Sequence, residues 1–445
     1  MRQLAATLPE ERYEANFADL APPLTPDQAL GESSRCLFCY DAPCTTACPT
    51  HIDVPAFIKM IASGNLRGAA REILDANPMG HSCARACPVE VLCEGACVLN
   101  QLHKRPIEIA RLQRYATDFA LEHRLRLFEP GAATGRRVAV VGAGPAGLAC
   151  AQDLRRCGHD VVIFEAREFP GGLNTYSIAD YKMKPPTALA EARMVLDLGA
   201  ELRTGVRVGE DVSFEELLEQ YDAVFVGVGL GGTRRLGIPG ESLHGVVDAL
   251  SFIEELKLRP KREVAVGRRV VVVGAGNTAI DAATQAKRLG AERVTIVYRR
   301  TDADMPAYHY EYELAKADGC EFRWSTLPVR FVGNAVVEAV ECVRTQSGRP
   351  LPGTEFRLDA DMVVLAIGQE PRASLLARIP GVRFQNGRLL ADPATGQTSN
   401  PRVFTGGDCA NGGKEIVNAA ADGKRAAAAI HALLRTMPQP VPAGG

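Results

Sequence analysis

The sequence predicts an α+α/β chain, in which an N-terminal helical, cysteine-rich domain precedes two Rossmann-like dinucleotide-binding domains. Three observations predict this arrangement. Eight of the 13 cysteines fall between Cys36 and Cys97. A pattern of apolar strand, Gly-rich turn, helix and second strand occurs twice after residue 136. A length of 445 residues corresponds to two or three domains of ordinary size.

The composition is that of a globular protein and excludes some partners. Hydrophobic residues make up 46% and charged residues 23%, with a net charge of −2. This balance gives no broad basic surface for nucleic acid or an anionic membrane. No apolar run approaches the roughly 20 residues of a bilayer span, and no secretory signal is recognisable. The expected location is the cytoplasm, without nucleic-acid or membrane partners.

Residues 1–128 are predicted to form the helical domain, with short helical patterns such as the one over 54–74. Its cysteines form two groups with spacings C-x2-C-x4-C-x3-C and C-x3-C-x5-C-x3-C, in order Cys36, Cys39, Cys44 and Cys48, then Cys83, Cys87, Cys93 and Cys97. Clustered cysteines in a cytoplasmic chain favour metal over disulfides. Such dense thiolates are typical of two [4Fe-4S] clusters, in which a group's last cysteine can serve the other cluster. A zinc site is the alternative.

The first glycine-rich turn follows a Gly-rich linker at 129–136 and an apolar strand. It reads G-x-G-x-x-G and comprises Gly142, Ala143, Gly144, Pro145, Ala146 and Gly147. A helix to about Cys157 and a strand ending at Glu165 complete a dinucleotide-binding unit. The glycines let the backbone approach a pyrophosphate, and the carboxylate suits the ribose diol of FAD or NAD. The alternative is a tight structural turn.

Two further segments favour FAD at this first turn. Gly172 and Leu173 follow Glu165 closely, and Gly407 and Asp408 close a strand near the C-terminus, where an aspartate can hold the ribityl chain. Residues 137–435 thereby resemble flavoproteins of the glutathione- and thioredoxin-reductase type. The resemblance implies a split FAD-binding domain at 137–230 and 366–435, with an inserted NAD(P)H-binding domain at 231–365. The composition of the last residues predicts a disordered tail at 436–445.

The second glycine-rich turn is predicted to bind NAD(P)H. It reads G-x-G-x-x-A after an apolar strand and begins with Gly274, Ala275, Gly276, Asn277 and Thr278. The next strand ends without an acid, and Arg299 and Arg300 follow, which favours a 2′-phosphate. Asp302 and Asp304 come directly after and oppose one, and the arginines could instead form a solvated turn. The pattern itself leaves the choice between NADH and NADPH open.

The cysteine pattern also predicts the direction of electron flow. Disulfide reductases of this fold need a redox-active cysteine pair, but no C-x-x-C occurs after Cys97. FAD accepts a hydride, whereas each cluster carries one electron. The expected path is from NAD(P)H to FAD, then through the clusters to an outside acceptor, and no protein residue is assigned as catalytic.

Four segments closely resemble the N-terminal half of dihydropyrimidine dehydrogenase, which in bacteria is a separate, PreT-type subunit. They read CLFCYDAPC at 36–44, NPMG at 77–80, CARACP at 83–88 and PIEIARLQ at 106–113. The resemblance covers about residues 30–435. The small subunit of glutamate synthase is similar in architecture but more distant in these segments.

The resemblance, and not the spacing, implies the ligand sets. One cluster would be held by Cys36, Cys39, Cys44 and Cys97, and the other by Cys48, Cys87, Cys93 and Gln113, which leaves Cys83 free. Without the resemblance, Gln113 is simply a helix-surface glutamine. The family also implies flavin contacts at Leu173, Lys182 and the segment from Asp408 to Ile416. It implies nucleotide contacts at Arg299, Arg300, Ala366, Ile367 and Gly368.

Two departures from the family bear on these contacts. The family's Ile-Pro-x-Phe-Arg near the flavin reads IADYK at 178–182, so a lysine replaces the arginine. A further arginine of the mammalian enzyme falls near Pro306, and the loss of that phosphate contact weakly favours NADH.

The resemblance implies an NAD(P)H-oxidising electron-transfer subunit. The FMN-containing barrel that reduces uracil and thymine in this family is missing from the sequence. The chain would therefore need a catalytic subunit of the PreA type, carrying FMN and iron–sulfur clusters, in a heterotetramer. The alternatives are the small subunit of glutamate synthase, or a related electron donor, and a non-enzymatic, zinc-bound nucleotide-sensing module.

Overall fold

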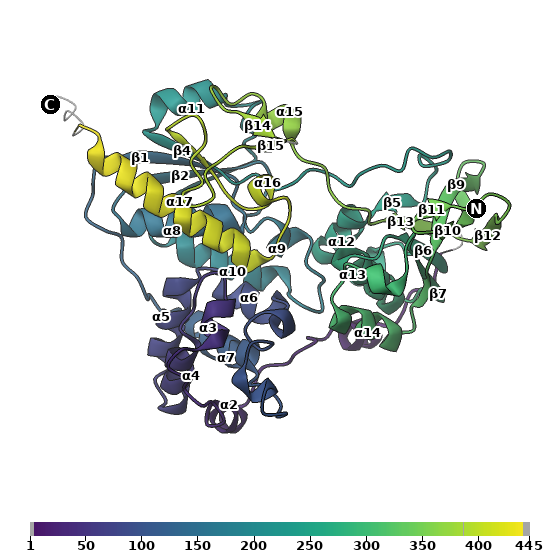
Figure 1. Ribbon diagram of the computed structural model, residues 1–445, viewed down its shortest axis with the longest axis horizontal. Helices are drawn as coiled ribbons and strands as arrows, with labels where there is room; N and C mark the ends of the chain where they lie inside the picture. The colour runs from purple at the N-terminus through teal and green to yellow at the C-terminus, as the bar shows by residue number, and fades with distance from the viewer. Residues whose placement is uncertain (1–3, 386, 439–445) are drawn as a thin grey trace. The chain divides into compact units, whose positions relative to one another are not determined.

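The computed structural model describes residues 4–385 and 387–438, which form two compact units (Figure 1). Unit 1 comprises the described part of 1–20 with 176–184 and 231–370. Unit 2 comprises 21–175, 185–230 and the described part of 371–445. Each unit contains its own parallel sheet.

The parallel sheet of unit 2 has five strands in the order β16-β4-β1-β2-β3. They are β1 (Arg137–Val141), β2 (Asp160–Glu165), β3 (Glu201–Thr204), β4 (Ala223–Val226) and β16 (Val403–Thr405). Residues 138–141 and 161–165 are buried throughout, as expected for strands covered on both faces. The register places Val141 beside Phe164 and Val226, so the carboxyl ends of these strands share one sheet edge.

Helices α8 (Pro145–Arg156) and α17 (Ile416–Thr436) pack closely against each other beside this sheet. A Cβ atom on Gly423 would lie 2.1 Å from the carbonyl oxygen of Ala146, so only glycine fits there. The other elements of this part are α9 (Leu173–Tyr176), α10 (Pro185–Leu196), α11 (Phe214–Gln220), α15 (Ala373–Leu376), the pair β14 (Phe384–Gln385) and β15 (Arg388–Leu389), and α16 (Asp408–Asn411).

The cysteine-rich region is helical, as predicted, and belongs to unit 2. Its elements are α2 (Pro26–Ser33), α3 (Pro43–Ala47), α4 (Val54–Ala62), α5 (Leu66–Ala76), α6 (Gly80–Ala86), η1 (Val89–Val91), η2 (Val98–Asn100) and α7 (Ile109–Glu122). In α5, Ala69, Ala70, Ile73 and Leu74 form a buried stripe at helical spacing. Asn65 begins this helix, because its side chain accepts a hydrogen bond from the Gly68 amide at 2.9 Å.

Unit 1 contains a second five-stranded parallel sheet, in the order β5-β13-β6-β7-β8, and an antiparallel sheet. The parallel strands are β5 (Val246–Asp248), β6 (Arg269–Val273), β7 (Arg293–Val297), β8 (Glu321–Arg323) and β13 (Met362–Leu365). The antiparallel strands are β9 (Thr326–Gly333), β10 (Val337–Gln346), β11 (Arg349–Pro350) and β12 (Phe356–Asp359). The helices are α1 (Glu10–Asn16), α12 (Ala249–Leu258), η3 (Lys261–Glu263), α13 (Asn277–Arg288), η4 (Asp302–Asp304) and α14 (His309–Ala317).

The first residues of the chain pack on unit 1 and not on the cysteine-rich region. Ala5 donates its amide to Val266 O at 2.9 Å, and Leu4 forms a bridge with Gly267. Tyr13 and Phe17 are 4% and 3% exposed and join the core beneath the parallel sheet of unit 1. The helical domain was expected to begin at residue 1, whereas the first residues pack on unit 1, because two aromatic side chains find their apolar partners there.

The fold class is confirmed, whereas three expected features of the chain's organisation differ. The helices of 21–128 share one hydrophobic core with β1 and α8, so they do not form a separate compact unit. The expected linker at 129–136 is held by hydrogen bonds from Gly131 and Thr134 to the end of α8 and the turn after it. Of the expected tail 436–445, Thr436 is helical and residues 439–445 lie outside the described part.

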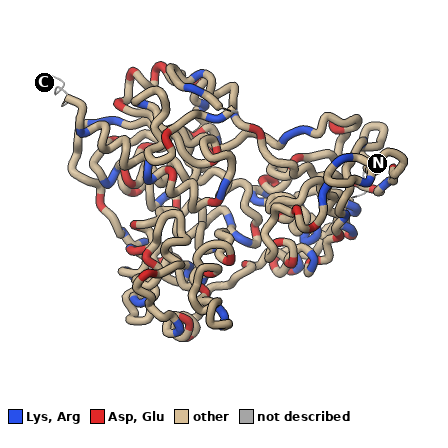
Figure 2. Tube along the Cα trace, in the orientation of Figure 1, with Lys and Arg blue, Asp and Glu red and all other residues tan. Residues whose placement is uncertain are grey.

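Charged residues of both signs alternate along both units (Figure 2). This distribution agrees with the net charge of −2. Of the helices in the described part of the chain, not one combines the length and the apolar character that a membrane crossing requires.

Candidate functional site

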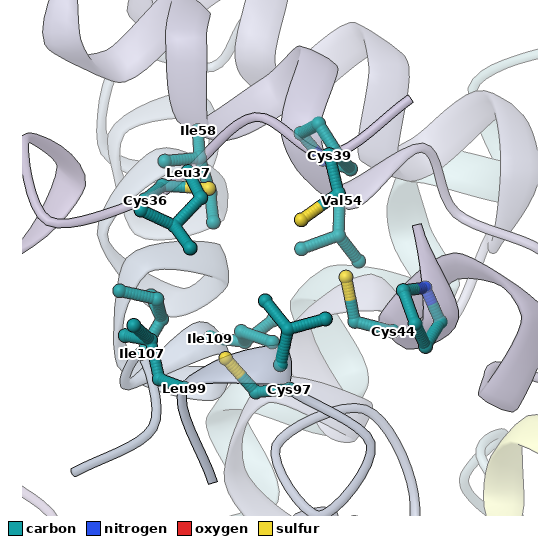
Figure 3. A pocket seen from close by; sticks show the side chains of 13 residues that line it. Cys36, Leu37, Cys39, Cys44, Val54, Ile58, Cys97, Leu99, Ile107 and Ile109 are labelled. Carbon is teal, nitrogen blue, oxygen red and sulfur yellow. The ribbon is translucent and has the colours of Figure 1, made fainter. Parts of the chain in front are cut away.

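Four cysteines surround a cavity in the helical part of unit 2 (Figure 3). Cys36 and Cys39 lie on the loop after α2, Cys44 lies on α3, and Cys97 directly precedes η2. Their sulfur atoms border about 370 Å³ of space, and apolar side chains complete the wall, among them Leu37, Val54, Ile58, Leu99, Ile107 and Ile109. Cys97 of the second group thus joins three cysteines of the first group, which is the set that the resemblance implies.

A second cavity, of about 340 Å³, brings together the other candidate ligands. Its wall contains Cys48, Cys83, Cys87, Cys93 and Gln113. Cys83 was expected to be free, but it lies on α6 and lines the same cavity as Cys87, which directly follows that helix. The structure therefore offers five side chains for a cluster that needs four ligands, and their choice stays a prediction.

Gln113 is oriented by a hydrogen bond and is not a helix-surface residue. It lies on α7, is 6% exposed, and its Nε2 donates to the Gly80 carbonyl at 2.8 Å. Because the nitrogen is used in this way, the amide oxygen is the atom left to act as a ligand. Cysteine spacing carries no signal for this residue, since it comes from another helix.

Asn77 is a residue of the second cavity that the sequence reasoning did not assign. It is fully buried, and its Nδ2 donates to Cys83 Sγ at 3.1 Å while its Oδ1 accepts from the Met79 amide at 3.0 Å. The NPMG segment was the available signal, but it was used only as a mark of resemblance.

The chemistry of both cavities fits clusters with a cationic iron–sulfur core. Burial raises the pKa of Cys44 to about 11, and it raises the pKa of Cys93 well above the ordinary value. Thiols in such apolar walls lose their protons when a metal centre binds the thiolates. Among the described residues, no group of three or more His, Cys, Asp or Glu side chains is placed to hold a metal ion. The thiols instead surround spaces, as they do around a cluster.

The first glycine turn connects β1 to α8 and has the backbone geometry of a pyrophosphate site. Gly142 has φ +101°, and a Cβ there would lie 2.5 Å from the Gly227 carbonyl oxygen. Gly144 begins α8 without a side-chain cap, so the first amides of the helix are available to an anion. A Cβ on Gly144 would meet no atom closer than 3.9 Å, so the space in front of the turn is open.

The other predicted flavin residues of unit 2 lie beside this turn, or at the beginning or end of neighbouring helices and strands. Glu165 ends β2 and accepts hydrogen bonds from the amides of Ala143 and Arg167, each at 2.9 Å. Gly172 approaches the turn so closely that a Cβ there would lie 2.9 Å from Gly144 Cα. Leu173 begins α9 with 39% of its surface exposed, and Ile416 begins α17. Pro145, Ala146 and Gly147 form the first turn of α8.

Asp408 follows Gly407 after β16, the strand beside β4. Burial raises the pKa of its carboxyl, which accepts a hydrogen bond from the Lys414 amide at 3.2 Å. Gly407 has φ +71°, and its amide donates to Asp422 at 2.9 Å. These bonds fix the segment at the sheet edge where β1, β2 and β4 also end.

The second glycine turn connects β6 to α13 in unit 1. Gly274 has φ +123°, and a Cβ there would lie 2.2 Å from the carbonyl oxygen of Ala366, which follows β13. Gly276 begins α13 without a side-chain cap. The structure thereby joins Gly274, Ala275, Gly276, Asn277 and Thr278 to Ala366, Ile367 and Gly368 at one sheet edge.

The segment after β7 folds back onto this turn. Ala307 donates its amide to Ala275 O at 3.2 Å, and the Tyr308 amide donates to Asn277 Oδ1 at 3.1 Å. Arg299 and Arg300 have exposed side chains. Within the described ranges, neither guanidinium group forms an ion pair.

The carboxylate of Asp304 accepts hydrogen bonds from a residue of its own loop. Its Oδ2 accepts hydrogen bonds from the Thr301 hydroxyl at 2.7 Å and the Thr301 amide at 3.3 Å, and these bonds lower the pKa of Asp304. The hydrogen bonds of this acid are thus made within its own loop, and the charge of Arg300 further lowers the pKa of Asp304.

Lys182 lies in a buried ion cluster of unit 1. Its Nζ is 2.7 Å from Asp281 Oδ1 and also donates to Glu311 Oε1, with 7% of the side chain exposed. Tyr181 donates its hydroxyl to Asp281 at 2.9 Å. The structure therefore shows two carboxylate partners for Lys182, and its predicted flavin contact stays a prediction.

Comparison with known proteins agrees with this arrangement. Residues 136–423 match the family described as pyridine nucleotide-disulphide oxidoreductase, and residues 13–125 match dihydropyrimidine dehydrogenase domain II, 4Fe-4S cluster. The chain is 35% identical over 424 residues to the NAD-dependent dihydropyrimidine dehydrogenase subunit PreT of Salmonella typhimurium, with 95% and 98% of the two chains covered. It is 35% identical over 440 residues to the NADPH glutamate synthase small chain of Escherichia coli, with 93% of each covered.

Solved structures show the same fold at lower identity. The FprA protein of Mycobacterium tuberculosis in complex with NADPH has a TM-score of 0.55 and 22% identity, with 66% of this chain and 84% of that chain covered. The thioredoxin reductase of T. acidophilum has a TM-score of 0.54 and 23% identity, with 67% and 98% covered.

Together, the two glycine turns and the thiol-lined cavities define an NAD(P)H-dependent flavin oxidoreductase with an iron–sulfur region. The chain belongs to the pyridine nucleotide-disulphide oxidoreductase family. The alternative of a non-enzymatic zinc module was therefore wrong.

Proposed function

We propose that the chain is the NAD(P)H-oxidising electron-transfer subunit of a cytoplasmic dihydropyrimidine dehydrogenase. The observation that carries the proposal is that unit 2 holds two cysteine-lined cavities and the first glycine turn on one hydrophobic core. The PreT relative, matched over 98% of its length, supports the reaction. The acceptor is an FMN- and iron–sulfur-containing subunit that reduces uracil or thymine, in a heterotetramer.

The residues of the first turn hold FAD in this proposal. The free amides at the start of α8 bind the pyrophosphate, Glu165 binds the adenosine ribose, and Asp408 binds the ribityl chain. FAD supplies the chemistry that accepts a hydride and releases electrons singly. The open amides at the start of α13 and the exposed Arg299 and Arg300 bind the nicotinamide nucleotide.

The two cavities hold two [4Fe-4S] clusters. Cys36, Cys39, Cys44 and Cys97 bind one, and Cys48, Cys87, Cys93 and Gln113 bind the other. The apolar walls exclude water, and the hydrogen bond from Gln113 to Gly80 fixes the amide whose oxygen binds iron. These residues thus provide a relay for single electrons that does not require a redox-active cysteine pair.

A second candidate function is that of a glutamate synthase small subunit. The 35% identity to that relative over 93% of both chains equals the identity to PreT. The two functions differ in the partner, since one couples to pyrimidine reduction and the other to glutamate formation. Co-expression with each class of partner separates them by which coupled reaction consumes NAD(P)H.

We further propose that NADH is weakly favoured over NADPH. A further arginine of the mammalian enzyme falls near Pro306, and Asp302 is an exposed acid on the same loop. Because Arg299 and Arg300 are unpaired and Asp304 is engaged, we expect a preference below about tenfold, or about 1.4 kcal/mol. Dye-linked oxidation rates with both nucleotides measure this ratio. A preference for NADPH above that factor would contradict the proposal.

Anaerobic purification tests the cofactor content. We expect one FAD per chain, with iron and acid-labile sulfide in the amounts of two four-iron clusters. Zinc in place of iron and sulfide would overturn the proposed function.

A further inference from the structure

Glu191 is a buried carboxylate that reaches from α10 to the start of α6. It is 1% exposed, and its Oε1 accepts hydrogen bonds from the His81 amide at 2.9 Å and the Ser82 amide at 3.1 Å. Its Oε2 accepts the Ser82 hydroxyl. Since α6 carries Cys83 and Cys87 directly follows it, the carboxylate anchors the helix that lines the second cavity.

Ser82 extends this contact to the turn that is assigned to the flavin. Its hydroxyl oxygen accepts a hydrogen bond from Asn174 Nδ2 at 2.9 Å. Asn174 is 2% exposed and follows Gly172 and Leu173, the predicted flavin residues. All of these residues belong to unit 2.

The resulting chain of bonds joins the two redox sites. It runs from the flavin turn through Asn174 to Ser82, and from there along one peptide bond to Cys83 in the wall of the second cavity. Glu191 and Gln113 both contact the start of α6. Glu191 accepts a hydrogen bond from the His81 amide, and Gln113 donates one to the Gly80 carbonyl.

We propose that Glu191 is a positioning residue for electron transfer between FAD and the second-cavity cluster. This inference rests on the proposed function. NADH and FAD give NAD+ and FADH−, and FADH− then gives two electrons, one after the other, and one proton. The cluster takes up each electron and passes it on to the one-electron acceptor of the partner subunit. Glu191 exchanges no atom in these steps; through Ser82 it fixes the start of α6 against the turn assigned to the flavin.

Replacement of Glu191 by Gln in the full chain with its cofactors tests the proposal. The change keeps the side-chain shape but removes the charge and weakens three hydrogen bonds. Glu219→Gln, at an exposed position of α11 in the same unit, removes the same charge and is the matched control. Anaerobic stopped-flow spectroscopy measures flavin reduction by NADH and the later reduction of the clusters, and redox titration followed by electron paramagnetic resonance measures the potential of each cluster.

We expect flavin and iron contents and the rate of flavin reduction to stay near those of the unmodified chain. Transfer from flavin to cluster should slow by about tenfold or more, as expected when fixed geometry is lost. The potential of the second-cavity cluster should rise, while that of the first-cavity cluster stays constant. Unchanged transfer and unchanged potentials would overturn the inference, as would equal shifts of both clusters.

Ser82→Ala keeps the test decisive if Glu191→Gln fails to fold. This variant removes the hydroxyl between Glu191 and Asn174 but leaves the two backbone hydrogen bonds to the carboxylate. It should also slow the transfer from flavin to cluster, and an unchanged rate would overturn the inference. A wild-type chain without iron and sulfide would instead overturn the proposed function, so the two failures are distinguishable.

Discussion

Glu311 shows how one residue couples the charge of a buried cluster to pH. It lies on α14, its Oε2 has no hydrogen-bond partner among the described residues, and Tyr310 and Lys182 contact its other oxygen. Burial, and then the charge of Asp281, raise the pKa of Glu311 to about 7, although Lys182 opposes the shift. The folded chain therefore binds a proton here more tightly than the unfolded chain does.

This raised pKa predicts that unit 1 loses stability as the pH increases. The contribution of Glu311 is fully present below its ordinary pKa of 4.5 and is lost as the pH rises through about 7. Trp324, the one tryptophan of the chain, lies between β8 and β9, so its fluorescence reports the unfolding of unit 1. Urea unfolding at several pH values should show this decline, and Glu311→Gln should flatten it. An equal decline in the variant would contradict the assignment.

Lys182→Met should destabilise unit 1 strongly. The charges of Asp281 and Glu311 outweigh the effect of burial and raise the pKa of Lys182, so this ammonium stays charged between them. Its removal leaves buried carboxylates without a cation, which costs about 3–5 kcal/mol. The exposed Lys184 provides the control Lys184→Met, for which we expect a change within about 0.5 kcal/mol. Unfolding followed by Trp324 fluorescence compares the two variants.

At the scale of elements, α1 and the residues around it show where sequence reasoning failed. The glycine turns have strong local signals, so both dinucleotide-binding sites could be located from β1–α8 and β6–α13 alone. The N-terminal arm has no such signal. Tyr13 lies on the short α1 and Phe17 directly follows it, and only the folded chain shows that their partners lie in unit 1. The ion pairs of Lys182 could not be predicted for the same reason, since Asp281 and Glu311 are about 100 residues away or more.

Phe17→Ala tests this placement of the arm. Phe17 is 3% exposed in the core of unit 1, and the deletion of a buried phenylalanine ring costs about 3–5 kcal/mol. The midpoint of the Trp324 transition should therefore fall, whereas Leu20→Ala, at a side chain 43% exposed, should have little effect. If Phe17→Ala leaves that transition unchanged, the arm does not belong to the core of unit 1.

At the scale of the whole molecule, the cavities give two separate points at which the electron path can be broken. Cys97 lines the first cavity together with Cys36, Cys39 and Cys44, although 52 residues lie between Cys44 and Cys97. No residue of the first glycine turn lines it. A change at the first cavity should therefore leave the flavin site intact.

Cys39→Ser should separate hydride uptake from electron exit. The variant loses one thiol of the first cavity and should bind less iron, while the FAD content and the reduction of FAD by NAD(P)H stay close to those of the unmodified chain. The isolated chain, with or without this change, should oxidise NAD(P)H with an artificial acceptor but should not reduce uracil, because the proposed function places the pyrimidine site in the partner. With the partner subunit present, the unmodified chain should support uracil-dependent oxidation, and Cys39→Ser should lower that rate by about tenfold or more, which is about 1.4 kcal/mol in the barrier. Cys157→Ser, at a half-buried cysteine that ends α8, is the control and should keep the coupled rate.

Full coupled activity in a Cys39→Ser protein that has lost a cluster would mean that electrons leave directly from the flavin. Uracil-dependent oxidation by the isolated chain would mean that it contains its own pyrimidine site.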